Sequence, residues 1–175
     1  MKRLPCLAAV LMCLGCAHAA SPHEHGVARL DIAVDAQRLT ISFETPLENL
    51  LDFERAPRNA AERKSVALLQ ERLQAATKLL LIDPAAGCGQ GQVELLSAAL
   101  GWGQAKAAGE KADAHADLDA NFSFECSNAN KARFIDIALL EAFPKLMRLN
   151  VQLSSVKGQS KTVLTRPAKR VTLPR

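Results

Sequence analysis

The sequence contains few aromatic residues and no tyrosine. Phe and Trp together make up 4% of the 175 residues, and the net charge at pH 7 is only +4. Surfaces that bind nucleic acids generally combine clustered basic groups with aromatic side chains that stack on bases, and no segment of this chain does so. We therefore expect no nucleic-acid partner. With 49% hydrophobic and 23% charged residues, the composition is typical of a globular domain rather than a disordered chain.

Long apolar runs are also scarce. The apolar run over residues 4–17 follows Lys2 and Arg3, and it is shorter than the roughly 18 residues of a membrane-spanning helix. Small residues follow it up to Ala20, as a signal peptidase requires. The pattern predicts a secretory signal peptide over residues 1–20 and a single domain over residues 21–175. Lipid attachment at Cys16 is an alternative, and in either case we expect a periplasmic protein with no transmembrane segment in the mature chain.

Only two cysteines lie outside the predicted signal peptide. The sequence has five, and removal of residues 1–20 leaves Cys88 and Cys126. An even pair in an exported protein most often forms a disulfide bond. The alternatives are a thiolate metal site or a catalytic thiol, and each requires that the thiols remain free. We predict the disulfide.

Alternating hydrophobicity predicts most of the sheet. Residues 28–34 and 39–44 alternate on either side of a short polar turn, which is typical of a hairpin. Residues 115–126 alternate strictly between apolar and polar side chains, and this is the clearest strand in the chain. Shorter strands are predicted over residues 93–99, 135–139, 149–153, 162–165 and 171–173.

Between the hairpin and the long alternating strand, the period changes to that of a helix. Val66, Leu69, Leu73, Ala76 and Leu80 recur at steps of three and four residues, with charged residues between them. Asn59 followed by Glu62 predicts a helix N-cap, so we expect one amphipathic helix over residues 60–81. Residues 87–91 and 101–111 read as loops. The predicted fold class is α+β, a mainly antiparallel sheet with one long amphipathic helix packed on it.

Charge is divided unevenly along the chain. Residues 21–130 carry 10 basic and 16 acidic side chains, and residues 131–175 carry 10 basic and 2 acidic ones. One interpretation is a pair of oppositely charged, solvated faces. The other is that the acidic part attracts a cation while the basic part docks on an acidic surface.

Histidine is scarce, but its spacing is informative. Outside the signal peptide the chain has His23, His25 and His115, and no serine, histidine and acid arrangement of a hydrolase is evident. His23 and His25 share one face if the first strand extends back to them. His115 begins the alternating strand, with Asp117 and Asp119 on the same polar face. If this strand lies beside the first strand, or near enough to face His25, the five side chains would offer imidazole and carboxylate ligands to one zinc ion. A frayed N-terminus with solvated histidines is the alternative.

Three segments resemble a known protein family. HEHGVARLDIAVDAQRLTISFETPLENLLDFERAP contains a His-acid-His-Gly strand, a Pro-x-x-Asn stretch at Pro46 to Asn49 and a Phe-Glu stretch at Phe53 and Glu54. HADLDANFSFEC is similar to a His-containing strand that ends in Cys. LLEAFPKLMRLNVQLSSVKGQ is similar to the Phe-Pro, Val-Gln and Lys-Gly-Gln segment. Together they resemble the periplasmic zinc-uptake proteins of the zinc-regulated ZrgA type.

The resemblance implies a non-enzymatic, zinc-binding accessory protein that passes zinc toward an ABC-type uptake transporter or its binding protein. The chain departs from the family at four points. Residues 105–114 contain no His-rich tract, and Arg55 stands where the family has His. Asp119 stands where a second His is frequent, and Asp52 stands where Gly is common. We therefore expect one zinc site rather than high-capacity buffering. The alternative is a metal-independent interaction module whose basic C-terminal strands dock a protein or an anionic envelope component.

Overall fold

Two β-sheets, one long helix and several short helices make up the fold. The computed structural model describes residues 24–103 and 116–174. The elements, in chain order, are β1 (Val27–Val34), β2 (Arg38–Pro46), η1 (Leu47–Asn49), α1 (Ala60–Gln74), α2 (Ala76–Leu79), β3 (Leu80–Ile82), η2 (Pro84–Ala86), β4 (Cys88–Leu96), β5 (Asp117–Cys126), η3 (Ala129–Lys131), β6 (Phe134–Ile137), α3 (Leu139–Ala142), β7 (Arg148–Ser155), β8 (Gly158–Thr165) and β9 (Arg170–Thr172). The α+β fold class with one long helix is confirmed.

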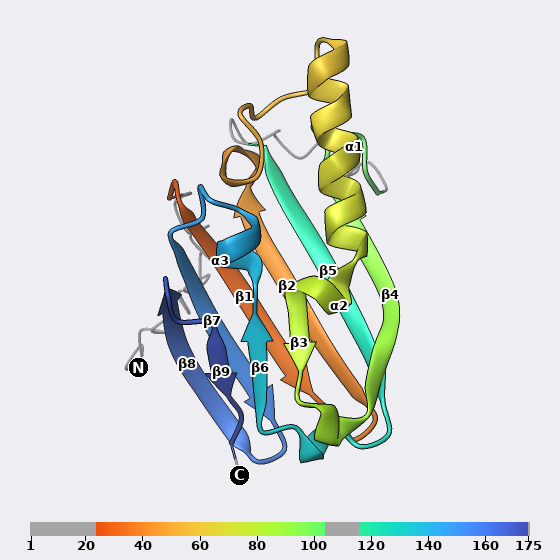
Figure 1. Ribbon diagram of the computed structural model, residues 1–175, viewed down its shortest axis with the longest axis vertical. Coiled ribbons are helices and arrows are strands. Elements are labelled where there is room, and N and C mark those ends of the chain that lie inside the picture. Colours follow the sequence, from red (N-terminus) through yellow and green to blue (C-terminus); the bar gives the residue numbers. More distant parts are fainter. Residues whose placement is uncertain (1–23, 104–115, 175) are drawn as a thin grey trace, which may run out of the picture.

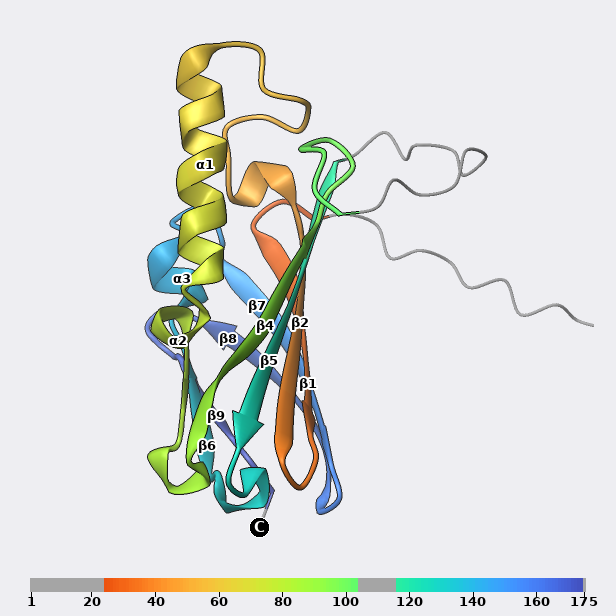
Figure 2. The ribbon, with the colours of Figure 1, turned by 90° about the vertical axis from the view of Figure 1, so that its right-hand side faces the viewer.

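The six-stranded sheet has the order β4-β5-β2-β1-β7-β8, and the smaller sheet has the order β3-β6-β9. Figures 1 and 2 show the smaller sheet and the helices on one face of the larger sheet, while its other face stays open. Alternation explains this arrangement, because every second residue of β1, β2 and β5 is buried. The hydrophobic core lies between the two layers.

Pairing in the large sheet is antiparallel at four of its five junctions. The exception is β1 with β7, which run parallel over the full length of both strands, from Val27 opposite Arg148 to Val34 opposite Ser155. The predicted hairpin over residues 28–44 is confirmed as β1 and β2. The predicted strand over residues 115–126 is confirmed as β5, with Leu118, Ala120, Phe122 and Phe124 buried.

The helix predicted over residues 60–81 ends earlier than expected. Asn59 does cap it, since its side chain accepts a hydrogen bond from the Glu62 amide at 2.9 Å. The helix breaks at Ala75, whose ψ of 52° is not helical, and Leu80–Ile82 forms strand β3 opposite β6. A short apolar run such as residues 79–82 fits a buried strand as well as a helix, so periodicity alone misassigned it.

Two other predictions were wrong. Residues 88–91 belong to strand β4 rather than to a loop, because the strand accommodates its glycines with a register shift between Gln90 and Val93. Leu139 begins α3 instead of ending a strand. Most of the predicted loop over residues 101–111 lies outside the described residues.

The predicted disulfide joins the two outermost strands at one edge of the large sheet. Cys88 of β4 lies directly opposite Cys126 of β5, and their sulfur atoms are bonded. The bond joins the start of β4 to the end of β5, where the glycine-rich β4 offers few side chains to the core. Among the described residues, no helix is long and apolar enough to cross a membrane.

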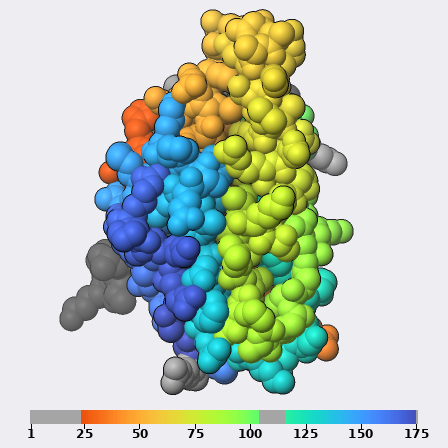
Figure 3. Space-filling view, viewed as in Figure 1, coloured from red at the N-terminus to blue at the C-terminus, as the bar shows by residue number. Residues whose placement is uncertain are grey.

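Helix α1 projects from one end of the molecule. Only Leu69 and Leu73 of its residues are buried, and the space-filling view shows its N-terminal turns standing beyond the rest of the surface (Figure 3). The first turn of the helix is held by an ion pair between Arg55 and Glu62, with nitrogen–oxygen distances of 2.7 and 3.0 Å. The first turn is therefore attached to the loop that precedes it.

Candidate metal site

The β1–β2 hairpin brings together two segments that flank it. Strand β1 starts just after His25, and β2 ends just before η1, with Arg29 of β1 opposite Glu44 of β2. In an antiparallel hairpin the residues before the first strand and after the second return to the same end. The residues around His25 therefore lie beside η1 and the loop that follows it.

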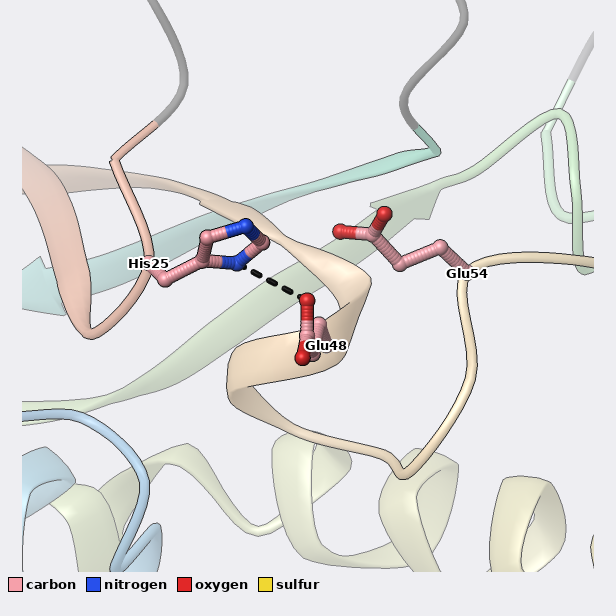
Figure 4. Close-up of side chains that lie close together, drawn as sticks. All are labelled: His25, Glu48 and Glu54. Atoms are coloured by element: carbon pink, nitrogen blue, oxygen red, sulfur yellow. Dashed lines mark ion pairs between the residues drawn. The ribbon is translucent and has the colours of Figure 1, made fainter.

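Three potential ligands meet at this end of the sheet. The Nδ1 atom of His25 lies 2.8 Å from Oε2 of Glu48, which is carried by η1. Glu54 approaches from the following loop, and Figure 4 shows its carboxylate directed toward the His25 ring. One ligand atom from each residue lies within 4.8 Å of the other two. The His25 and Glu48 side chains are 68% and 45% exposed, so solvent reaches the cluster.

The donor set suits zinc. Zinc takes imidazole nitrogen and carboxylate oxygen as ligands at about 2.0–2.2 Å, usually in tetrahedral geometry, so two ligands of one ion lie about 3.3–3.6 Å apart. The three atoms here lie within 4.8 Å of one another and the His25–Glu48 pair lies at 2.8 Å, so side-chain movements of about 1 Å, which open this pair and close the wider gaps, reach these distances. At 2.8 Å, Nδ1 of His25 and Oε2 of Glu48 are at hydrogen-bonding distance, and an ion that binds between these two atoms must replace this contact.

Contacts on the opposite side hold the His25 segment against β7. Glu24 forms an ion pair with Arg148 at 2.7 Å, and the Gly26 carbonyl accepts hydrogen bonds from the Met147 and Arg148 amides at 2.7 and 3.0 Å. Gly26 has a φ of 77°, in the left-handed region that glycine adopts without strain. His25 thus occupies a fixed tight turn rather than a free end.

The predicted ligands fall into three groups. His23 and His115 lie outside the described residues, whereas His25 belongs to the cluster. Asp117 and Asp119 lie at the start of β5, opposite Pro46 and Glu44 of β2, and they are not part of the cluster found among the described residues.

The strand β5 is not the direct neighbour of β1, because β2 lies between them. Both strands run antiparallel to β2, so their first residues lie at the same end of the sheet. The start of β5, which follows His115 in the sequence, therefore shares the sheet end that carries the cluster.

Glu48 and Glu54 were missed as ligands by the sequence reasoning. Both occur in the stretches that carry the family resemblance, at Pro46 to Asn49 and at Phe53 and Glu54. The hairpin itself was a usable signal, because it returns residues 47–54 to the start of β1. Sequence reasoning paired histidines by strand alternation and did not consider the segment after the second strand.

Arg55 does not take the place of the family's histidine at this cluster. Its guanidinium pairs with Glu62 and lies 5.1 Å from the centre of the Phe53 ring. The pKa of Glu62 is lowered from 4.5 to about 2, mainly by the hydrogen bond from the Arg55 guanidinium and next by the hydrogen bond from the Arg58 amide. Arg55 therefore stabilises the loop before α1.

A separate hollow lies away from this cluster. A groove of about 800 Å³ crosses the open face of the six-stranded sheet and is lined by polar side chains such as Ser42, Asn121 and Ser154 and by charged ones such as Arg29 and Lys161. Antiparallel sheets commonly leave one polar face to solvent, and the groove contains no imidazole. We assign no function to it.

Comparison with known proteins agrees with the sequence resemblance. A family model described as ZrgA family zinc uptake protein matches residues 22–173, nearly the whole chain. No curated protein matches the sequence. The matched range includes both sheets, the disulfide and the cluster around His25. The chain therefore belongs to the ZrgA family of zinc uptake proteins.

Proposed function

We propose that this protein is a periplasmic, non-catalytic zinc carrier that holds one zinc ion at the end of the β1–β2 hairpin. The observation that supports the proposal is the gathering of His25, Glu48 and Glu54 within 4.8 Å on an exposed surface of a zinc-uptake family member. An accessory protein must release its metal, and three protein ligands at a solvent-exposed position leave room for a ligand from an acceptor.

The remaining predicted ligands are candidates to complete the site. His23 is two residues from His25, and His115 is two residues from Asp117 at the same end of the sheet. We propose that one or both imidazoles join the cluster when zinc binds, with Asp117 and Asp119 as further carboxylates nearby. The expected acceptor is a zinc ABC transporter or its binding protein.

Zinc titration by calorimetry of the metal-stripped mature protein tests the proposal. We expect about one zinc per chain, and we expect His25→Ala and Glu48→Gln each to weaken binding by at least tenfold because each removes a ligand. Glu94→Gln is the matched control, since it neutralises a carboxylate on β4 that is outside the cluster. His23→Ala and His115→Ala then show which imidazole completes the site.

Absence of zinc binding would favour the alternative, a metal-independent docking module that uses the basic C-terminal strands. Several of those basic groups are already paired. Arg148, Arg170 and Lys169 form ion pairs with Glu24, Asp136 and Glu141, and Arg166 donates to four backbone carbonyls, those of Leu140, Phe143, Pro144 and Leu146. The ion pairs offset three of these positive charges and the carbonyl contacts occupy the donors of Arg166, which is why we place the zinc function first.

A further inference from the structure

The buried side chain of Asn49 connects the two segments that carry His25 and Glu48. Asn49 is 3% exposed and directly follows Glu48 at the end of η1. Its Oδ1 atom accepts a hydrogen bond from the Gly26 amide at 2.6 Å, and its Nδ2 atom donates to the Val27 carbonyl at 3.0 Å. Both partners belong to the two residues that follow His25.

A third hydrogen bond fixes the amide itself. Nδ2 also donates to the Thr45 Oγ1 atom at 2.9 Å, so both of its protons are used and the amide can face only one way. Thr45 is 1% exposed, which keeps water away from these contacts. A buried amide with all its donors satisfied holds its partners firmly, because any displacement leaves polar groups unpaired.

These bonds act where the ladder between β1 and β2 has not yet begun. The Cα register of β1 with β2 starts at Arg29 opposite Glu44, and His25 lies four residues before it. On the opposite side, the β7 amides hold the Gly26 carbonyl. Asn49 holds the amide of the same residue, so the turn that carries His25 is clamped between β7 and η1.

We infer that Asn49 is a positioning residue that holds His25 against Glu48 and thereby sets the zinc affinity of the site. This inference rests on the proposed function. Asn49 touches no ligand atom of the cluster, and it acts by fixing the backbone on which His25 stands. Polar groups that orient metal ligands in this way typically contribute 10–100-fold to metal affinity.

The test compares Asn49→Leu with Thr45→Val. The first change removes all three hydrogen bonds and keeps the number and branching of the side-chain heavy atoms. The second removes the bond to Thr45 and leaves those to Gly26 and Val27, so it is a matched control for loss of a buried hydrogen bond. We expect Asn49→Leu to weaken zinc binding by about 10–100-fold and Thr45→Val by clearly less than tenfold.

A second variant covers the case in which Asn49→Leu does not fold. Asn49→Ser is small and neutral, leaves space for water, and is too short to reach both Gly26 and Val27. It should show the same loss of zinc affinity relative to Thr45→Val. The free energy of unfolding is measured for every variant without zinc, so that a general loss of stability is recognised.

A readout without metal separates this inference from the proposed function. The ¹⁵N NMR signal of His25 Nδ1 reports its hydrogen bond to Glu48, and Glu48→Gln provides the reference for a weakened contact. We expect the signal in Asn49→Ser to move toward that reference while Thr45→Val stays like the wild type. Wild-type protein that bound no zinc would refute the zinc function. The NMR comparison would still test whether Asn49 positions His25, because it is made without metal.

An unchanged Nδ1 signal in Asn49→Ser, or a zinc affinity equal to that of Thr45→Val, would overturn the inference. Asn49 would then stabilise the fold without positioning His25.

Discussion

Gly26 is required by backbone conformation more than by space. Its φ is 77°, and an added Cβ would lie 2.5 Å from the Cε methyl of Met147. That methyl ends a flexible side chain which is 60% exposed, so it can move away. The conformational strain of a residue with a Cβ remains, and it is the larger obstacle to substitution.

We therefore expect Gly26→Ala to lower the free energy of unfolding by about 1–2 kcal/mol, measured by urea denaturation. Gly101→Ala is the control that isolates conformational strain from crowding, because Gly101 has a φ of 68° and no atom within 4 Å of its added Cβ. Gly26→Asn should cost less than Gly26→Ala, since Asn tolerates the left-handed region better. Equal stability of Gly26→Ala and the wild type would contradict this account.

Glu62 makes part of the stability dependent on pH. Its folded pKa, about 2, lies below its ordinary value of 4.5, mainly because the Arg55 guanidinium stabilises the carboxylate. A lowered folded pKa adds stability above pH 4.5, and this stability is lost as the pH falls from about 4.5 toward 2. The pKa of Asp83 is lowered because its carboxylate accepts hydrogen bonds from the Ala85 amide and from Arg133. The pKa of Asp136 is lowered because its carboxylate accepts hydrogen bonds from Arg170.

Glu62→Gln should lower stability at neutral pH and flatten the acid dependence between about pH 4.5 and 2. Asp83 and Asp136 contribute to the slope that remains. Thermal unfolding followed across this pH range measures the effect, with Glu94→Gln as a control that removes a carboxylate of β4 outside the Arg55–Glu62 pair. A slope identical to that of the wild type would show that the Arg55–Glu62 pair contributes nothing in solution.

At the scale of elements, strands with strict alternation were predictable and short apolar segments were not. Alternation located β1, β2, β5 and β7 because burial on one face requires it. The run over residues 79–82 is apolar at every position, so tertiary pairing with β6 decided its conformation. The glycines of β4 resembled a loop because their register shift depends on the partner strand.

The candidate metal site was partly predictable for a similar reason. His25 was identified from its spacing. Glu48 and Glu54 become neighbours of His25 only through the hairpin and the turn of η1. A carboxylate in a polar loop has no distinctive sequence pattern. Its nearness to His25 is therefore visible only once the start of β1, η1 and the following loop are placed in the fold.

The disulfide between β4 and β5 should be important for stability. We expect Cys88→Ser to lower the free energy of unfolding by about 2–5 kcal/mol, because the bond restricts the unfolded chain between the two cysteines. Chemical denaturation measures the loss, and alkylation followed by mass spectrometry should find no free thiol in the oxidised native protein. Two alkylatable thiols in the native protein would contradict the bond.

For the whole molecule, metal capacity and pH dependence follow from the small number of histidines. The chain has three histidines beyond residue 20 and no His-rich tract, so we expect it to bind about one zinc ion. Zinc affinity should fall between about pH 7.5 and 5.5, because imidazole groups generally take up protons in this range and compete with the metal.

Calorimetric titrations at several pH values check both points. The His25→Ala variant should show a weaker pH dependence, since one competing proton has been removed. Binding of several zinc ions per chain, or an affinity that did not change with pH, would point to carboxylate surfaces in place of an imidazole site.

The parallel pairing of β1 with β7 has a consequence for how the protein forms. The strand nearest the N-terminus lies inside the sheet, and one of its two neighbours is supplied by a segment near the C-terminus; even the Glu24–Arg148 ion pair joins residues 124 positions apart. The sheet cannot be completed until almost the entire polypeptide is available, and contacts between distant segments slow folding. A chain that becomes available from its N-terminus onward would therefore keep an open strand edge until its last quarter arrived, and the turn that holds His25 would acquire its final geometry at the same late moment.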